Sequence, residues 1–266
     1  MLMHIVDELI EERATKLMRS PLVWRLVKRF LFPLFKHNEA IEMVNRYSSE
    51  SGFNIFSDLL ETTNIRLSVA GLENLPKTGA TVVVANHPAG LPDGIAIFGA
   101  LAGVRPDICF MANRDAIRCV KKMDEVIIPV EWVESKRSRE KTKETLLAIR
   151  SAIKSQRLIV IFPSGRLARP SFSGLIEREW MPSAFAIAQK NNLSIVPVHI
   201  KARNSFLYYL LFFLNTELKD LTLFREMLIP RKKKYEVTIG KPFESGSDPS
   251  EQAQTLYGYV TKVLAR

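Results

Sequence analysis

Short apolar runs alternate with amphipathic segments along most of the 266-residue chain. Runs rich in Val and Ile predict strands at residues 65–70, 80–85, 126–130, 158–162 and 195–200, with a late strand at 237–239. Apolar positions at helical spacing predict helices at residues 95–104, 141–156 and 183–191. This alternation is typical of an α/β fold, and we expect a largely parallel central sheet flanked by helices.

Residues 1–64 have a different pattern, with apolar positions three and four residues apart and few turn residues. We therefore expect an N-terminal helical segment over residues 1–64, followed by an α/β domain over residues 65–266. Ser20 before Pro21 predicts the start of a helix, because Ser caps helix ends and Pro suits the first helical position. Pro33 should kink or end this helix.

The helix that begins at Pro21 has a basic stripe on one side and apolar side chains on the other. The basic residues are Arg25, Lys28, Arg29 and Lys36, and the apolar ones are Val23, Leu26, Val27, Phe30, Leu31 and Leu34, with Trp24 and Phe32 near the edges. Such a helix could lie in the headgroup layer of an anionic membrane. It could equally dock on the protein's own core with its charges in water, so the pattern leaves both arrangements open.

The composition is that of a folded, basic protein, with 47% hydrophobic and 25% charged residues. The formal charge of +10 favours phosphate-bearing partners, among them nucleic acid, anionic lipid and coenzymes. The sequence contains no helix-turn-helix, zinc-finger or RNA-motif signature, so we expect no nucleic-acid partner. Cys109 and Cys119 match no common metal-ligand spacing and are interpreted as reduced core thiols of a cytosolic protein.

The sequence favours contact with a membrane from one side only. Acidic residues at positions 7, 8, 11 and 12 argue against a secretory signal, and the longest apolar run, residues 206–214, is shorter than the roughly 20 residues needed to span a bilayer. This aromatic run could line an acyl channel, dip into the membrane interface or form a buried helix. The basic cluster at residues 231–234 could hold anionic headgroups or form a solvated loop. We expect a peripheral or monotopic protein at the cytoplasmic face of a membrane.

A His and an Asp lie together in a Gly- and Pro-rich turn at the end of a predicted strand. The strand at residues 81–85 runs directly into residues 86–94, which contain His87 and Asp93. The loops at strand ends are common places for sites in α/β proteins. An imidazole can take a proton from an alcohol, and a carboxylate bonded to its other nitrogen fixes the tautomer and stabilises the imidazolium. We predict that His87 is a general base and that Asp93 orients it.

The turn at residues 86–94 resembles the first motif of the glycerolipid acyltransferases, the family of 1-acylglycerol-3-phosphate acyltransferases and their relatives. That motif is Asn-His followed by a downstream Asp, here Asn86, His87 and Asp93. Five residues separate His from Asp where the common form has four, and Gly90 could absorb the extra residue. This departure resembles the bacterial hemolysin-like branch, which includes lyso-ornithine-lipid acyltransferases.

A second segment, residues 161–169, is similar to the family's Phe-Pro-Glu-Gly-Thr-Arg motif, which is implicated in binding the acceptor. Phe162, Pro163 and Gly165 coincide with it, Ser164 replaces the Glu, and Arg166 stands one place before the usual Arg. The resemblance implies a substrate-binding set of Asn86, Ser164, Gly165, Arg166 and Arg169. Surface solvation is the competing interpretation for the two arginines.

Two further segments match the family less specifically. The region around Arg137 stands where the family has another motif, although a solvated charge run over residues 134–143 explains it more simply. Residues 196–198 resemble a family strand that carries a proline, and His199 beside them is interpreted as a strand histidine and not as a second base. His4 and His37 lie in the helical segment and suggest no specific chemistry.

The resemblance implies an acyltransferase domain over residues 65–266 that moves a fatty acyl group from acyl-CoA or acyl carrier protein to the hydroxyl of a lysolipid. Lysophosphatidic acid and lyso-ornithine lipid are both candidate acceptors, and no bound cofactor or metal is expected. One alternative is a non-catalytic peripheral lipid-binding protein with the same fold. Another is a serine hydrolase that uses Ser164, but the first Gly of the Gly-x-Ser-x-Gly elbow is missing.

Overall fold

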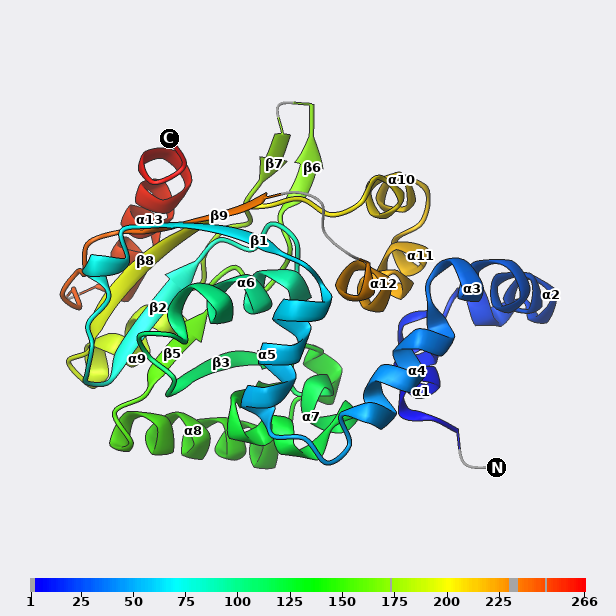
Figure 1. Cartoon of the computed structure of the whole chain (residues 1–266), viewed down its shortest axis with the longest axis horizontal. Coiled ribbons are helices and arrows are strands. Elements are labelled where there is room, and N and C mark those ends of the chain that lie inside the picture. Colours follow the sequence, from blue (N-terminus) through cyan, green and yellow to red (C-terminus); the bar gives the residue numbers. More distant parts are fainter. Residues whose placement is uncertain (1–2, 173, 230–233, 247) are drawn as a thin grey trace.

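The computed structural model of the chain describes residues 3–172, 174–229, 234–246 and 248–266. Within these residues a seven-stranded sheet forms the centre, in the order β1-β9-β8-β2-β5-β3-β4 (Figure 1). Its strands are β1 Arg66–Ala70, β2 Thr81–Ala85, β3 Ile108–Asn113, β4 Ile127–Val130, β5 Leu158–Ile161, β8 Ser194–Lys201 and β9 Lys234–Ile239. Neighbouring strands are parallel except β8 and β9. The predicted largely parallel sheet is confirmed.

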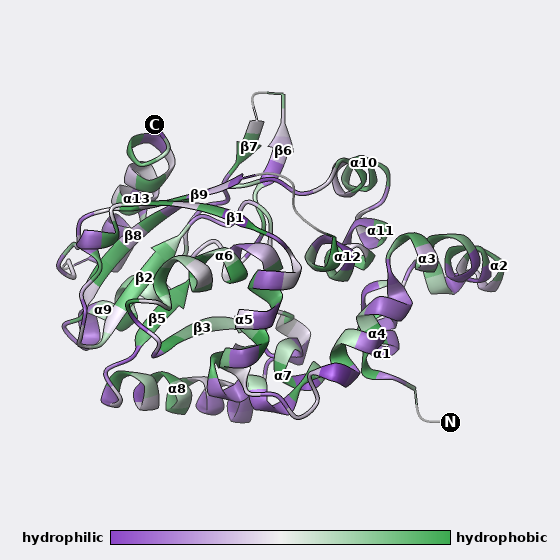
Figure 2. Ribbon diagram, viewed as in Figure 1, coloured by the Kyte–Doolittle hydropathy of each residue, from purple (hydrophilic) through white to green (hydrophobic). Residues whose placement is uncertain are grey.

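Alternate residues of the central strand β2 enter two separate hydrophobic clusters. Val83 packs with residues of α5 Gly52–Thr62 and α6 Leu91–Leu101 on one face of the sheet. Val82 and Val84 pack on the other face with residues of α8 Arg139–Lys154, α9 Ser183–Lys190 and α13 Pro249–Gly258. Figure 2 shows the apolar strands inside and helices such as α8 with a polar outer side. The period of two along β2 therefore produces the two layers of helices.

The N-terminal segment is helical, as predicted. It contains α1 Ile5–Arg13, α2 Pro21–Leu26, a π-helical turn Val27–Leu31, α3 Phe32–Leu34, α4 His37–Arg46 and α5. Pro33 lies in the last helical turn before Phe35, which agrees with the predicted end of the helix. Buried side chains of α1 and α4 belong to the same hydrophobic cluster as α6, so these helices share a core with the sheet.

The helix from α2 to α3 has two apolar faces, whereas the sequence pattern suggested one. Trp24, Val27 and Phe32 are buried against the rest of the protein. A second set of apolar side chains on the same helix is exposed, namely Leu22, Val23, Leu26, Phe30 and Leu34. The helix therefore docks on the protein's own core and still presents an apolar surface to its surroundings.

Several elements were not predicted. They are strand β3, the hairpin of β6 Arg169–Ser171 and β7 Gly174–Ile176, and helices α7 Asp115–Cys119, α11 Thr216–Leu221, α12 Leu223–Leu228 and α13. The segment 206–214 forms α10 Phe206–Leu214, in which Tyr208 and Leu211 are buried while Phe206, Phe213 and Leu214 are exposed. Residues 231–233 of the predicted basic cluster lie outside the described residues, and Lys234 begins β9.

Neither membrane crossing nor thiol chemistry is indicated in the part of the chain that the structure describes. Each helix there falls short of the length and apolar character that a bilayer span requires. Cys109 and Cys119 are free thiols, and burial raises the pKa of each to about 11. Both thiols therefore remain protonated near neutral pH, in line with the predicted core role.

Candidate active site

His87 and Asp93 contact each other at the carboxyl end of β2. The Nδ1 atom of His87 lies 2.9 Å from Oδ2 of Asp93. A carboxylate accepts hydrogen bonds, so the proton belongs on Nδ1 and the lone pair of the neutral ring is on Nε2. The His87 ring stacks on Phe162, with 4.2 Å between the ring centroids, and its side chain is 16% exposed. The arrangement holds the imidazole in one orientation and leaves it accessible.

Asp93 is fully buried and organises the turn as well as the imidazole. Its Oδ2 atom also accepts hydrogen bonds from the backbone N–H groups of Ala89 at 2.8 Å and Gly90 at 2.9 Å. Asp93 is the third residue of α6, so its carboxylate also caps the start of that helix. Gly90 has a φ of +87°, a conformation that favours glycine.

The peptide of His87 is held on both sides by the segment that follows β5. Its N–H donates to Oε2 of Glu177 at 3.0 Å, and its carbonyl oxygen accepts from the N–H of Ala168 at 2.8 Å. The Nε1 atom of Trp180 donates to the other oxygen of Glu177 at 3.3 Å. Burial raises the pKa of the Glu177 carboxyl, while the hydrogen bonds from His87 and Ser164 oppose that rise.

Sequence reasoning did not identify Glu177. It stands in the charged run Glu177-Arg178-Glu179, which looks like a solvated surface segment. The one local signal is Trp180 directly after that run, because a tryptophan tends to be buried and draws its neighbours inward. Contact with His87 arises from tertiary structure, since the two residues are 90 positions apart.

Asn86 joins the end of β2 to the end of β8. Its side-chain amide donates to the carbonyl oxygen of Ile200 at 2.9 Å and accepts from the N–H of Ile200 at 2.7 Å. The side chain is buried, and both of its polar atoms are engaged. Through these contacts Asn86 holds the end of β2 against β8. Its assignment as a substrate contact stays a prediction.

The four other predicted site residues lie in the turn and hairpin after β5. Ser164 is buried, its hydroxyl donates to the carbonyl oxygen of Arg166 at 2.9 Å, and its interaction with the Glu177 carboxylate lowers the pKa of that carboxyl. These partners are not those of a catalytic serine, which needs an imidazole base. Gly165 has a φ of +59°, and the side chains of Arg166 and Arg169 are exposed. The turn and hairpin after β5 thus lie beside the peptide of His87, through the hydrogen bond from Ala168.

The remaining histidines and Arg137 are occupied elsewhere. His199 lies in β8, where burial lowers its pKa and a hydrogen bond with the backbone of Val260 opposes that shift. His4 caps α1, and His37 lies 2.7 Å from a carboxylate oxygen of Asp7. The exposed side chain of Arg137 donates to the carbonyl oxygen of Glu131 at 3.2 Å. These contacts agree with the structural interpretations of the sequence.

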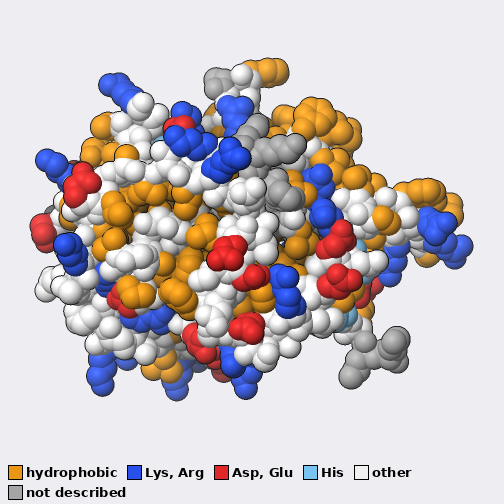
Figure 3. Space-filling view, viewed as in Figure 1, with side chains coloured by type: hydrophobic (Ala, Val, Ile, Leu, Met, Phe, Trp, Pro, Cys, Tyr) orange, Lys and Arg blue, Asp and Glu red, His pale blue; other side chains and the backbone are white. Residues whose placement is uncertain are grey.

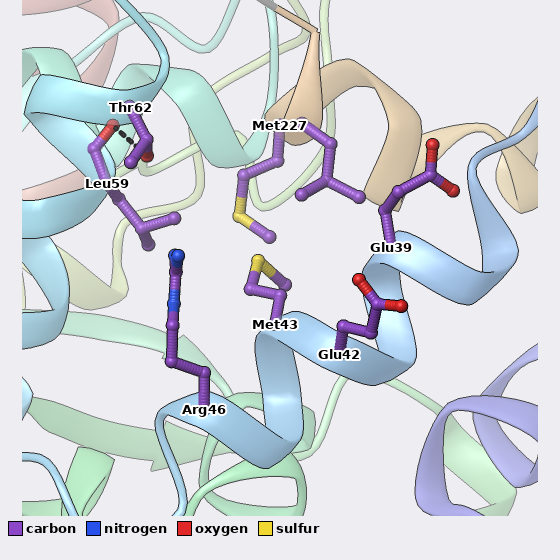
Figure 4. Close-up of a pocket in the computed structure, with 8 residues that line it drawn as sticks. Glu39, Glu42, Met43, Arg46, Leu59, Thr62 and Met227 are labelled. Carbon is purple, nitrogen blue, oxygen red and sulfur yellow. Dashed lines mark hydrogen bonds between the residues drawn. The ribbon is translucent and has the colours of Figure 1, made fainter.

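A cavity of about 340 Å³ lies between α4, α5 and α12, and none of the predicted site residues lines it (Figure 4). Its walls combine the carboxylates of Glu39 and Glu42 and the guanidinium of Arg46 with apolar side chains such as Met43 and Met227. Among the described residues, no three His, Cys, Asp or Glu side chains are grouped so that they could hold a metal ion.

Comparison with known proteins identifies the class to which this fold and site belong. The Acyltransferase family matches residues 66–201, from the first strand of the sheet to the end of β8 and across both His87 and Ser164. The chain belongs to this family, and it is an acyltransferase.

Two curated relatives match nearly the whole chain. The lyso-glycine lipid O-acyltransferase of Phocaeicola vulgatus is 26% identical, with 90% of each chain covered. The protein of the same name from Bacteroides thetaiotaomicron is 24% identical, with 97% of this chain and 96% of the relative covered. The crystal structure of the 1-acyl-sn-glycerophosphate acyltransferase PlsC from Thermotoga maritima shares the fold, with a TM-score of 0.54 and 18% identity over 91% of this chain and 97% of that one.

The Gly165→Ala variant tests how closely the turn after β5 is packed. An added Cβ atom would lie 2.1 Å from Cζ3 of Trp132, and the positive φ disfavours any side chain. We expect the free energy of unfolding in urea to fall by about 2 kcal/mol or more. Gly103→Ala is the control, because no heavy atom lies within 4 Å of its added Cβ. Equal unfolding free energies for the two variants would contradict the packing described for Trp132.

Proposed function

We propose that this acyltransferase moves a fatty acyl group to the hydroxyl of a lysolipid, with His87 as the general base. The observation that carries the proposal is the 2.9 Å contact between Nδ1 of His87 and the buried carboxylate of Asp93. This contact leaves the lone pair of Nε2 for an incoming hydroxyl. The names of the two curated relatives support a lysolipid as the acceptor.

The proposed reaction needs no covalent enzyme intermediate. Nε2 of His87 takes the proton of the lysolipid hydroxyl while the hydroxyl oxygen attacks the carbonyl carbon of the acyl thioester. The tetrahedral intermediate collapses when its C–S bond breaks. The imidazolium of His87 returns the proton to the departing sulfur, which leaves as a thiol. Asp93 stabilises the imidazolium during the interval. The thioester is that of acyl-CoA or acyl carrier protein, and the mechanism uses no metal.

We propose a lyso-amino-acid lipid of the glycine type as the first acceptor to test. Both named relatives align with this chain over nearly their whole length. The headgroup of a glycine lipid ends in a carboxylate, which an arginine can bind through two parallel hydrogen bonds. Arg166 and Arg169 are exposed beside the turn that holds His87. Lyso-ornithine lipid and lysophosphatidic acid also carry anionic groups and remain acceptors for comparison.

A mixed-acceptor assay tests this function. Purified protein is incubated with acyl-CoA or acyl carrier protein and with each of the three lysolipids, and mass spectrometry identifies the product. We expect His87→Ala to lower kcat by about a hundredfold or more, because a general base contributes at least that much. Asp93→Asn should also lower kcat while lipid binding is retained.

The proposal fails if the parent protein acylates none of the three lysolipids with either donor. It also fails if His87→Ala turns over as fast as the parent.

The Arg166→Ala variant tests acceptor recognition. If Arg166 binds the acceptor carboxylate, its loss should raise the KM for lyso-glycine lipid by about tenfold with little change in kcat, because ground and transition states lose the same contact. The assay uses neutral detergent micelles, so that general attraction to an anionic surface does not contribute. Arg150→Ala, an exposed arginine on α8, is the control. An unchanged KM in Arg166→Ala would show that Arg166 does not bind the acceptor carboxylate, and Arg169→Ala would then be tested in the same way.

We propose that the protein rests on one side of an anionic membrane, at its cytoplasmic face, and takes the lysolipid from there. Apolar side chains are exposed on the α2–α3 helix, on α10 and, as Phe172, in the β6–β7 hairpin. Figure 3 shows apolar groups on the surface in these regions. Phe30 is 67% exposed and Phe213 is 72% exposed. Exposed basic residues accompany them on the α2–α3 helix, including Arg25 and Arg29.

Vesicle co-sedimentation tests this orientation. Replacing Leu26 and Phe30 together by Ser should lower the partition onto anionic vesicles by about tenfold or more, since two large apolar side chains lose their contact with lipid. The matched control replaces Leu146 and Leu147 by Ser, because these are also exposed and belong to α8, which lies apart from the α2–α3 helix (Figure 1). If both double variants bind vesicles like the parent, the α2–α3 helix is not the membrane contact.

A further inference from the structure

We infer that Glu177 is a positioning residue of the active site, whose carboxylate holds the peptide of His87 in the geometry that proton transfer requires. The inference rests on the proposed role of His87 as the general base. Glu177 is 9% exposed, and its Oε2 atom accepts the N–H of His87 at 3.0 Å. Asp93 therefore fixes the imidazole of His87, while Glu177 fixes the backbone from which that imidazole projects.

The Glu177 carboxylate joins three separate parts of the site. One oxygen accepts from the turn after β2, through His87, and the other accepts from the indole of Trp180. Ser164, in the turn after β5, also interacts with this carboxylate and lowers its pKa. The carbonyl oxygen of Glu177 in turn accepts from the hydroxyl of Tyr257 in α13, at 3.2 Å. The residue is thereby held at both its side chain and its backbone.

The contact with Ser164 explains how the site accommodates its altered motif. The similar family motif has a Glu where this chain has Ser164, and the structure places a different carboxylate against that serine. Glu177 stands 13 residues later and reaches this point because the β6–β7 hairpin turns the chain back toward β5. We read Ser164 and Glu177 as a pair in which the small side chain leaves room for the carboxylate that arrives from the hairpin.

The geometry separates this role from that of a catalytic acid or base. Both oxygens of Glu177 accept from N–H groups of the protein, and the N–H of His87 that one of them accepts belongs to the backbone and not to the ring. Burial also disfavours the charged carboxylate, and the surrounding donors offset that cost. Loss of Glu177 should let the His87 turn shift. A shift of about 1 Å can cost about a hundredfold in rate while leaving the substrate's own contacts in place.

Steady-state kinetics of purified variants test the inference. We expect Glu177→Ala to lower kcat by about a hundredfold, with the KM values for donor and acceptor within about threefold of the parent. The kcat of Glu177→Gln should lie between those of the parent and Glu177→Ala, because an amide has one acceptor oxygen where the carboxylate has two, so it can accept from His87 but not also from Trp180 through a second oxygen. Rates are measured well below each variant's melting temperature and are normalised to folded protein. Glu179→Gln, an exposed carboxylate two residues away, is the matched control and should turn over like the parent.

A residue exchange provides the second measurement. Glu177→Ser alone should lower kcat. Adding Ser164→Glu to it should raise kcat at least about tenfold above that of Glu177→Ser, because a carboxylate at position 164 lies near the same N–H donors. Recovery supports the inference. If the doubly substituted protein has the parent's circular dichroism spectrum but no recovered activity, the pairing of Ser164 and Glu177 is refuted.

The outcomes distinguish this inference from the proposed function. If His87→Ala loses turnover and Glu177→Ala keeps a kcat within about threefold of the parent, Glu177 only contributes to stability and the inference is overturned. A raised KM at unchanged kcat in Glu177→Ala also overturns it, because that result indicates a substrate contact. If the parent transfers no acyl group, or His87→Ala equals the parent, the proposed function itself has failed.

Discussion

One carboxylate oxygen, Oδ2 of Asp93, organises the turn that carries His87. It accepts three N–H groups, from the ring of His87 and from the backbones of Ala89 and Gly90, and the residue has no exposed surface. Removing a carboxylate from water costs several kcal/mol unless donors replace the lost hydration. The turn therefore has to bring its N–H groups to this oxygen. The same contacts start helix α6 and select the imidazole tautomer that can accept a proton.

A second carboxylate supports the same turn from the opposite direction. Glu177 and Ala168 hydrogen-bond the N–H and the carbonyl oxygen of His87, so the turn that carries His87 is linked to the segment after β5. Asn86, directly before His87, is fixed to the backbone of Ile200 in β8. Because β8, β2 and β5 are neighbours in the sheet, these contacts tie three adjacent strand ends together. The position of the His87 imidazole thus depends on β8, β2 and β5 being neighbours in the sheet.

The distribution of apolar surface complements this rigid centre. The central strands are buried on both faces, whereas the α2–α3 helix, α10 and the β6–β7 hairpin retain large exposed apolar side chains. An acyltransferase acting on a lysolipid has to meet a substrate that partitions into membranes, and such side chains reduce the cost of approaching that surface. The hairpin carries Phe172 at its exposed end and leads into Glu177, so it connects the exposed apolar surface with the contacts of His87.

The amino-acid sequence by itself determined the local features of this protein. His87 and Asp93 are six residues apart in one turn, and the Val-rich run before them is a buried strand in almost any parallel sheet, so both could be predicted. Strand β3 was missed because its residues, Ile108–Asn113, contain a single β-branched side chain and no alternation. The partners of His87 and Asn86 depended on tertiary structure, since those contacts join residues 90 and 114 positions apart. Which side of α2–α3 and of α10 is buried also depended on tertiary structure. Periodicity shows that a side of a helix is apolar, whereas only the packing of the whole chain decides which apolar side is covered.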